Sequence, residues 1–245
     1  MMRILRSAWI WGTAAALILA WIPLMAVVSL ADRSPTKIRR ARWFRRLGPL
    51  TSKANPAWRL HVAGLENFRR DRAYVFVANH QSLADIPLIS HLRQDSKWLA
   101  KAELFRFPVM GWFMRLAGDI PVDRSDRRKA AQALLKCASY LRQGVSVVFF
   151  PEGTRSRDGC IQPFNDGPFQ LALREQIPVV PVVVEGTGNA LPRSSWIFSE
   201  RSDMYLRVLP PFSPQGWRDP GELREAVRQR MIDELEMLRG CKLQA

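Results

Sequence analysis

The sequence has few cysteines, and no two of them lie close together in the chain. Cys137, Cys160 and Cys241 are the only three among 245 residues, and none belongs to a Cys-x-x-Cys pair. This spacing argues against a zinc site and against a disulfide framework. A reducing compartment is the default expectation for such a chain.

The motifs of several enzyme classes are also missing. The sequence contains no G-x-S-x-G elbow, no Walker loop and no H-E-x-x-H pair. These patterns mark a serine nucleophile, a nucleotide phosphate site and a zinc site. Internal repeats and low-complexity segments are absent as well. If the protein is an enzyme, the sequence therefore offers no nucleophile of a familiar kind.

Acidic residues are scarce relative to basic ones. The chain has 22 Asp and Glu against 37 Lys and Arg, which gives a formal net charge of +15. Such an excess favours an anionic partner, either nucleic acid, an anionic bilayer or an acidic protein. The length suits one medium-sized domain with an appendage.

One segment, residues 7–31, has no charge at all and reads SAWIWGTAAALILAWIPLMAVVSLA. As a helix it would extend about 37 Å, enough to cross a hydrocarbon core of about 30 Å. Trp9, Trp11 and Trp21 suit interfacial anchoring, and Pro23 predicts a kink or a division into two pieces. A cleaved secretory signal is the alternative, but the apolar run is longer than a typical signal core. We expect a membrane anchor helix over residues 1–32, which either crosses the bilayer or lies in one leaflet.

A basic segment follows the apolar run directly. Residues 33–46 read RSPTKIRRARWFRR, with seven basic residues and no acidic one. This asymmetry predicts a cytoplasmic location for the rest of the chain. A solvated charge run is one interpretation, and a basic amphipathic juxtamembrane segment over residues 33–57, lying on anionic membrane lipids, is the other. Because the excess charge lies beside an apolar span, we expect no nucleic-acid partner.

From residue 58 onward, strand and helix patterns alternate. This alternation predicts an α/β domain over residues 58–245, with a largely parallel central sheet flanked by helices and a final amphipathic helix over residues 220–238. In such sheets ligands bind beyond the carboxyl ends of the strands. The expected strands cover residues 58–64, 73–79, 97–101, 119–124, 145–150, 176–186 and 204–212.

The stretch VFVANHQSLADIP, residues 75–87, places His80 directly after a strand and Asp85 five positions later. Ser82 and Asp85 have the form of a helix capping box, which needs no histidine. Alternatively, Asp85 binds one imidazole nitrogen of His80 and leaves the other to act as a general base. Both interpretations can hold together. Without an enzyme nucleophile, such a pair suggests activation of a substrate hydroxyl and direct transfer between two bound substrates.

A second polar stretch, FFPEGTRSRDG, covers residues 149–159 and also follows a strand. Its arginines and exposed backbone amides suit a phosphate group, although an ordinary polar surface loop is the alternative. A third stretch, GDIPVDR, ends another strand at Arg124.

With these pieces in this order, the sequence closely resembles the glycerolipid acyltransferases, specifically bacterial 1-acyl-glycerol-3-phosphate acyltransferases. The likeness runs from about Trp58 to Gly186. The family's H-x4-D motif matches His80 and Asp85, and its FPEGTRS block matches residues 150–156 without a change. Blocks similar to GDIPVDR, to KAEL at Lys101 and to VVPVVV around Pro181 are also present.

The resemblance implies that His80 deprotonates the free hydroxyl of a lysophospholipid acceptor. The oxygen then attacks the thioester of acyl-CoA or acyl-carrier protein, giving phosphatidic acid without an acyl-enzyme. Asp85 would orient His80, and the reaction would need no metal and no cofactor. The catalytic domain would lie on the cytoplasmic side of the cell inner membrane. The substrate-binding residues that it implies are Lys101, Arg124, Glu152, Gly153, Thr154 and Arg155.

One departure from the family pattern concerns the acceptor. The family usually has a Phe followed by basic residues and Gly after its FPEGTRS block, whereas this chain has Asn165 and Asp166 there. Fewer cations beside an anion pocket would weaken its binding of phosphate. A different acceptor, such as a lyso-ornithine lipid, is therefore an alternative to lysophosphatidic acid. A non-catalytic membrane-surface lipid-binding protein is a further alternative, against which the complete motifs speak.

Overall fold

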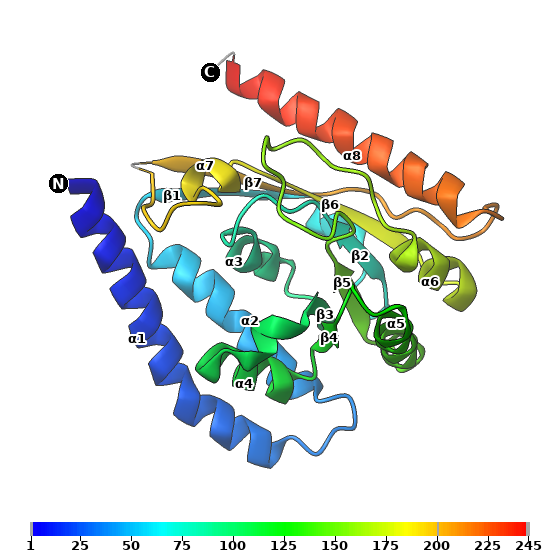
Figure 1. Ribbon diagram of the computed structural model, residues 1–245, viewed down its shortest axis with the longest axis horizontal. Helices are drawn as coiled ribbons and strands as arrows, with labels where there is room; N and C mark the ends of the chain where they lie inside the picture. Colours follow the sequence, from blue (N-terminus) through cyan, green and yellow to red (C-terminus); the bar gives the residue numbers. More distant parts are fainter. Residues whose placement is uncertain (1, 200, 244–245) are drawn as a thin grey trace.

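The computed structural model describes residues 2–199 and 201–243, with side chains up to residue 240, so the side chain of Cys241 lies outside the described residues. Seven strands form one sheet in the order β1-β7-β6-β2-β5-β3-β4 (Figure 1). Every neighbouring pair is parallel except β6 and β7, which are antiparallel. The predicted α/β fold with a largely parallel sheet is therefore confirmed. The strands are β1 Trp58–Ala63, β2 Val75–Ala78, β3 Ser96–Lys101, β4 Ile120–Val122, β5 Ser146–Phe149, β6 Val179–Glu185 and β7 Ser202–Val208.

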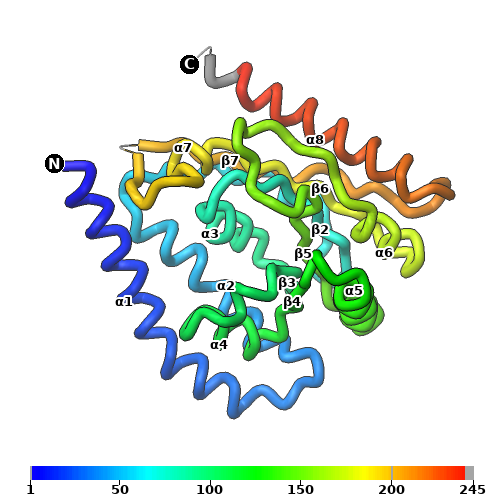
Figure 2. The backbone as a smooth tube through the Cα atoms, in the orientation of Figure 1, coloured from blue at the N-terminus to red at the C-terminus, as the bar shows by residue number. Residues whose placement is uncertain are grey.

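Helices cover both faces of this sheet. α5, α6 and α8 lie on one face, and α1 to α4 lie on the other (Figure 1). Figure 2 shows how β1 and β7, far apart in the sequence, run side by side at one edge of the sheet. The helices are α1 Met2–Ala31, α2 Ile38–Lys53, α3 Asp85–Ile89, α4 Pro108–Ala117, α5 Arg127–Arg142, α6 Gly167–Glu175, α7 Thr187–Ala190 and α8 Pro220–Leu243, with shorter helical turns at Leu65–Asn67, Ser90–Leu92 and Ala102–Arg106.

The central strand β2 shows why the sheet is buried on both sides. All four of its residues are inaccessible to solvent. Val75 and Val77 pack under α5, α6 and α8, whereas Phe76 and Ala78 pack with the opposite layer, as the alternation of side chains along a strand requires. A strand covered on both faces reads as a continuous apolar run, and that is the pattern from which it was predicted.

The apolar N-terminal segment forms the single helix α1, which Pro23 does not divide. Among the described residues it is the one helix long and apolar enough to cross a membrane. Yet both of its ends contact the rest of the protein. Near the start, Ser7 Oγ accepts a hydrogen bond from Phe198 N at 2.9 Å, and near the end Met25 is buried against α2 and α4. The helix therefore lies along the domain over about 27 Å.

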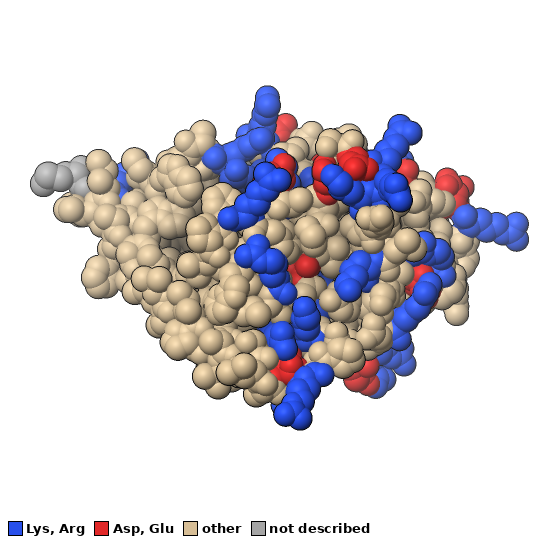
Figure 3. Space-filling view, turned by 60° about the horizontal axis from the view of Figure 1, so that its bottom comes forward, with Lys and Arg blue, Asp and Glu red and all other residues tan. Residues whose placement is uncertain are grey.

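Much of the basic segment is paired within the protein. Arg42 forms a bidentate contact with Asp95 at 2.9 and 2.6 Å, and Arg45 pairs with the buried Asp119. Figure 3 shows Lys and Arg side chains gathered over the centre and right of one face of the molecule, while the left part of that face is almost free of charge. This face thus divides into a charged region and a region almost without charge.

Candidate active site

The candidate site lies at the carboxyl ends of β2 and β5, which are neighbours in the sheet. His80 follows β2 by two residues and Glu152 follows β5 by three. Between β2 and His80, Asn79 pairs with the adjacent β6. Its side chain accepts a hydrogen bond from Val184 N at 2.8 Å and donates one to Val184 O at 2.9 Å. The Asn79 side chain thus continues the pairing of β2 with β6 by one residue, and it fixes the position at which the chain leaves the sheet before His80.

His80 and Asp85 form a close pair. His80 Nδ1 lies 2.6 Å from Asp85 Oδ2, with the Asp85 side chain fully buried and that of His80 18% exposed. A carboxylate accepts hydrogen bonds only, so this contact places the imidazole proton on Nδ1 and leaves Nε2 able to accept one. Among the described residues, no hydroxyl or thiol group is hydrogen-bonded to Nε2. The geometry suits a general base that acts on a bound molecule.

The same carboxylate oxygen also holds the start of α3. Asp85 Oδ2 accepts hydrogen bonds from Gln81 N at 2.7 Å and from Ser82 N at 3.0 Å. The Ser82 hydroxyl instead accepts from Ala84 N at 3.2 Å and donates to Leu191 O at 2.6 Å. Only the aspartate half of the capping box is therefore formed. The same oxygen atom therefore serves both as the helix cap and as the partner of the His80 imidazole.

Phe150 fixes the imidazole plane. Its ring stacks on His80 with centroids 4.2 Å apart and an angle of 28° between the planes. Trp98 meets the edge of Phe150 at 6.2 Å. The sequence did not indicate this role for Phe150, although its place directly before Pro151-Glu152-Gly153 was visible.

Glu152 joins the loop after β5 to the loop after β2. Its Oε1 accepts a hydrogen bond from His80 N at 2.7 Å, and its Oε2 accepts one from Gln162 N at 2.9 Å. Burial raises the pKa of Glu152 to about 7, although the two backbone amides act in the opposite direction. Both carboxylate oxygens are directed at the protein backbone, and the implied role of Glu152 in substrate binding stays a prediction.

Gly153 brings the same loop close to Arg124. Its φ of +78° is a conformation that glycine adopts without strain, and a Cβ atom there would lie 3.0 Å from Arg124 Nη1. Asn165 supports this turn, because its backbone and side-chain amides donate to Pro151 O at 2.9 and 2.7 Å. Asp166 pairs with Arg224 of α8. The two residues that depart from the family pattern thus hold the loop in place.

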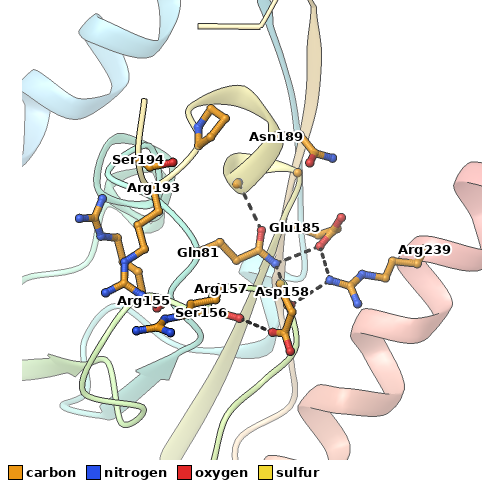
Figure 4. Close-up of a pocket in the computed structure, with 14 residues that line it drawn as sticks. Gln81, Arg155, Ser156, Arg157, Asp158, Glu185, Asn189, Arg193, Ser194 and Arg239 are labelled. Carbon is orange, nitrogen blue, oxygen red and sulfur yellow. Dashed lines mark hydrogen bonds and ion pairs between the residues drawn. The ribbon is translucent and has the colours of Figure 1, made fainter. Parts of the chain in front are cut away.

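The remaining predicted site residues do not all gather at this point. Lys101, at the end of β3, is exposed and pairs with Glu103 at 3.2 Å. Thr154 is exposed. Arg155 lines a different pocket, next to Gln81 and Arg193, on the side of β6 (Figure 4). The structure therefore places Gly153 and Arg124 on one flank of His80 and Arg155 on the other.

Within the part of the chain that the structure describes, no cluster of three or more His, Cys, Asp and Glu side chains could hold a metal ion. The site is built instead from one imidazole, buried carboxylates and arginines.

Comparisons with known proteins agree with this arrangement. A family model described as Acyltransferase matches residues 59–185, about half of the chain. A 1-acyl-sn-glycerol-3-phosphate acyltransferase of Brassica napus is 41% identical over 157 residues, which are 64% of this chain and 46% of that protein. One of Saccharomyces cerevisiae is 36% identical over 181 residues, 71% of this chain and 59% of that protein. The chain thus spans about half the length of these curated relatives.

A solved structure extends the comparison to nearly the whole chain. The crystal structure of the 1-acyl-sn-glycerophosphate acyltransferase PlsC from Thermotoga maritima superposes with a TM-score of 0.84 at 29% sequence identity. It covers 97% of this chain, and this chain covers 96% of it. From the family match, the fold and the paired His80 and Asp85, the chain belongs to the acyltransferase family.

Proposed function

We propose that this protein transfers a fatty acyl group from acyl-CoA or acyl-carrier protein to the free hydroxyl of 1-acyl-glycerol-3-phosphate, giving phosphatidic acid. The observation that carries the proposal is the 2.6 Å contact between His80 Nδ1 and the buried Asp85, with Nε2 left to accept a proton. The names of the relatives and of the PlsC structure support the choice of acceptor and reaction.

In this mechanism His80 Nε2 takes the proton of the acceptor hydroxyl while the oxygen attacks the thioester carbonyl. A C–O bond forms, the C–S bond breaks, and the departing sulfur takes the proton from the imidazolium. Asp85 stabilises the imidazolium between these steps. General acid–base catalysis of this kind typically contributes about 10²–10⁴-fold to the rate.

The acceptor's phosphate is assigned to the flank that holds Arg124, Gly153 and Lys101. Arg124 is exposed at the end of β4 and lies against the loop that also carries Glu152. A guanidinium group binds phosphate oxygens through two parallel N–H donors, and the Gly153 backbone leaves room for this approach.

The lipid acceptor is proposed to arrive from the bilayer. α1 exposes large apolar side chains such as Trp9 and Leu19, at 65% and 58%. Because both ends of α1 are held against the domain, we place it in one leaflet, on the cytoplasmic side of the cell inner membrane. Trp11, also on α1, donates a hydrogen bond to Trp196 O at 2.8 Å. This bond connects the lipid-facing helix to the loop before β7.

A second candidate acceptor rests on Asn165 and Asp166, which replace basic residues near Gly153. Without those cations, a lysolipid that lacks a phosphate, such as lyso-ornithine lipid, is the alternative.

The test is the release of free thiol from oleoyl-CoA and from oleoyl-carrier protein by the purified chain. Lysophosphatidic acid, lyso-ornithine lipid and no acceptor are compared side by side. We expect release only with lysophosphatidic acid. Release only with lyso-ornithine lipid would overturn the proposed acceptor. No release with any acceptor, from protein that still binds vesicles, would favour the non-catalytic lipid-binding alternative.

A further inference from the structure

A pocket of about 820 Å³ lies beside His80 on the flank away from Arg124. Gln81, the residue after the base, forms part of its wall, and so does Ser156, whose backbone N–H donates to His80 O at 2.8 Å. Other parts of the wall come from the turn after β6 and from α8 (Figure 4). This volume is within the range of pockets that bind small molecules and cofactors.

The pocket is rich in arginine. Arg155, Arg157 and Arg193 line one side, and Arg239 reaches in from α8 on the other (Figure 4). Within the described part of the chain, none of the first three is in a salt bridge. The Arg193 side chain donates a hydrogen bond to the backbone oxygen of Arg155 at 2.9 Å, which holds Arg193 against this loop.

The two acidic residues of the pocket already have donors. Glu185 accepts hydrogen bonds from Gln81 at 3.0 Å and pairs with Arg239 at 3.4 Å. Asp158 accepts from the Ser156 hydroxyl and from Cys160 N, both at 2.9 Å. The charge that remains for a ligand is therefore positive, which suits a phosphate group.

Direct transfer requires two anionic substrates to meet at one base. In the sheet, β2 carries His80 between β5, β3 and β4 on one side and β6 on the other. Arg124 follows β4, whereas this pocket opens beside the turn after β6. Two separate cationic regions thus flank the base, one for each substrate.

We propose that this pocket binds the phosphate group at the head of the pantetheine arm of the acyl donor. This phosphate ester is common to coenzyme A and to the prosthetic group of a carrier protein. The inference rests on the proposed acyltransferase function and adds to it a donor site on the β6 flank. Arg157 and Arg193 contact the phosphate, and the acyl thioester extends past Gln81 to His80.

The test uses the double variant R157A/R193Q in the full chain, with lysophosphatidic acid saturating. Initial rates are measured against oleoyl-CoA, oleoyl-carrier protein and oleoyl-pantetheine, which has no phosphate. We expect KM for a phosphate-bearing donor to rise about tenfold or more, since two charged contacts are lost, with KM for oleoyl-pantetheine unchanged. The matched control is R218Q, which removes an exposed arginine outside the pocket. Thermal midpoints check that both variants fold.

The assays with different acyl donors distinguish coenzyme A from carrier protein as the source of the phosphate. A rise in KM for both oleoyl-CoA and oleoyl-carrier protein supports the site, and if the wild type turns over only one of them, that one is its donor. A rise confined to one of two donors that the wild type uses would overturn recognition of the shared phosphate. An equal rise for oleoyl-pantetheine would overturn phosphate recognition. In a second series lysophosphatidic acid is varied at saturating oleoyl-CoA, and a rise in its KM with no rise in the donor KM would make the pocket an acceptor site and overturn the proposal. If the wild-type chain turns over no donor, the proposed function fails, and the pocket is then tested by calorimetric binding of coenzyme A alone. Binding by the wild type that R157A/R193Q abolishes would support the phosphate site. No binding by the wild type would overturn it.

Discussion

The strand ends around His80 and the outer surface of α1 are built in opposite ways. Around His80, one oxygen of Asp85 accepts three hydrogen bonds, and Glu152 accepts two from the backbone. Along α1, the described side chains are largely apolar and mostly uncovered, with only Ser7, Ile10 and Met25 buried. One region holds polar atoms in fixed positions, as the proposed catalysis requires, and the other leaves apolar surface uncovered, as the proposed membrane attachment requires.

Because the two regions share no side chains, catalysis and membrane attachment should be separable. A substitution at the strand ends should change turnover and leave vesicle binding intact, and a substitution on α1 should do the reverse. Asp85→Asn and Leu19→Glu test this separation directly, and Glu152→Gln and Lys97→Met test how the polar groups around the sheet hold the fold.

Replacement of Asp85 by Asn should lower kcat by about 10²–10⁴-fold, because the imidazolium loses its stabilising charge. The fold should persist. All three donors bind Oδ2, while Oδ1 has no hydrogen-bond partner among the described residues, so an amide nitrogen fits at Oδ1. Steady-state kinetics and a thermal melt measure the two effects. A melt as low as that of Asp85→Ala, or turnover near wild type, would contradict the account.

Leu19→Glu should reduce binding to anionic vesicles about tenfold or more, because a large apolar side chain no longer enters the lipid and a charge takes its place. Leu19 is 58% exposed, so the folded protein accommodates the change. Leu135→Glu is the matched control, since Leu135 is 59% exposed on α5, away from α1. Equal loss of vesicle flotation by both variants would show that α1 has no special role.

Glu152→Gln should lower the free energy of unfolding by about 1–3 kcal/mol. An amide has a single acceptor oxygen, so either His80 N or Gln162 N loses its partner and faces an NH₂ group. Chemical denaturation in detergent gives the value, and kcat should fall as well, since His80 loses its anchor. An unchanged midpoint would show that the two loops are held together by other contacts.

Lys97→Met should change how stability depends on pH. Burial lowers the pKa of Lys97 to about 7, while Lys97 donates to Lys37 O at 3.2 Å and to Ala117 O. Between about pH 7 and the ordinary lysine value near 10.5, the unfolded chain holds a proton that the folded protein has released. Wild-type stability should therefore rise with pH across this window relative to the variant. Thermal midpoints at pH 7 and pH 9 measure the difference, and parallel curves would contradict the shifted pKa.

Local pattern was enough to predict the sheet and the His80 pair. Apolar runs specified the buried strands, such as residues 73–79, which contain β2. His80 and Asp85 are only five positions apart, so their contact needs no distant part of the chain to form.

Contacts between distant segments were not predictable in this way. The basic residues of α2 were expected to face solvent or lipid, but Asp95 and Asp119 pair with two of them from across the fold. The antiparallel direction of β7 and the bond between Asn79 and β6 likewise depend on strands brought together only by folding. The sequence likewise does not show that Arg155, two positions after Gly153, lines the pocket beside β6.

The most direct test of the central claim is His80→Ala, measured at the same time for thiol release with lysophosphatidic acid, for thermal midpoint and for vesicle binding. The account predicts that turnover disappears while the midpoint and vesicle binding stay near those of the wild type. Retained turnover would remove His80 as the general base. Loss of the folded state together with turnover would instead make the pair with Asp85 a structural cap.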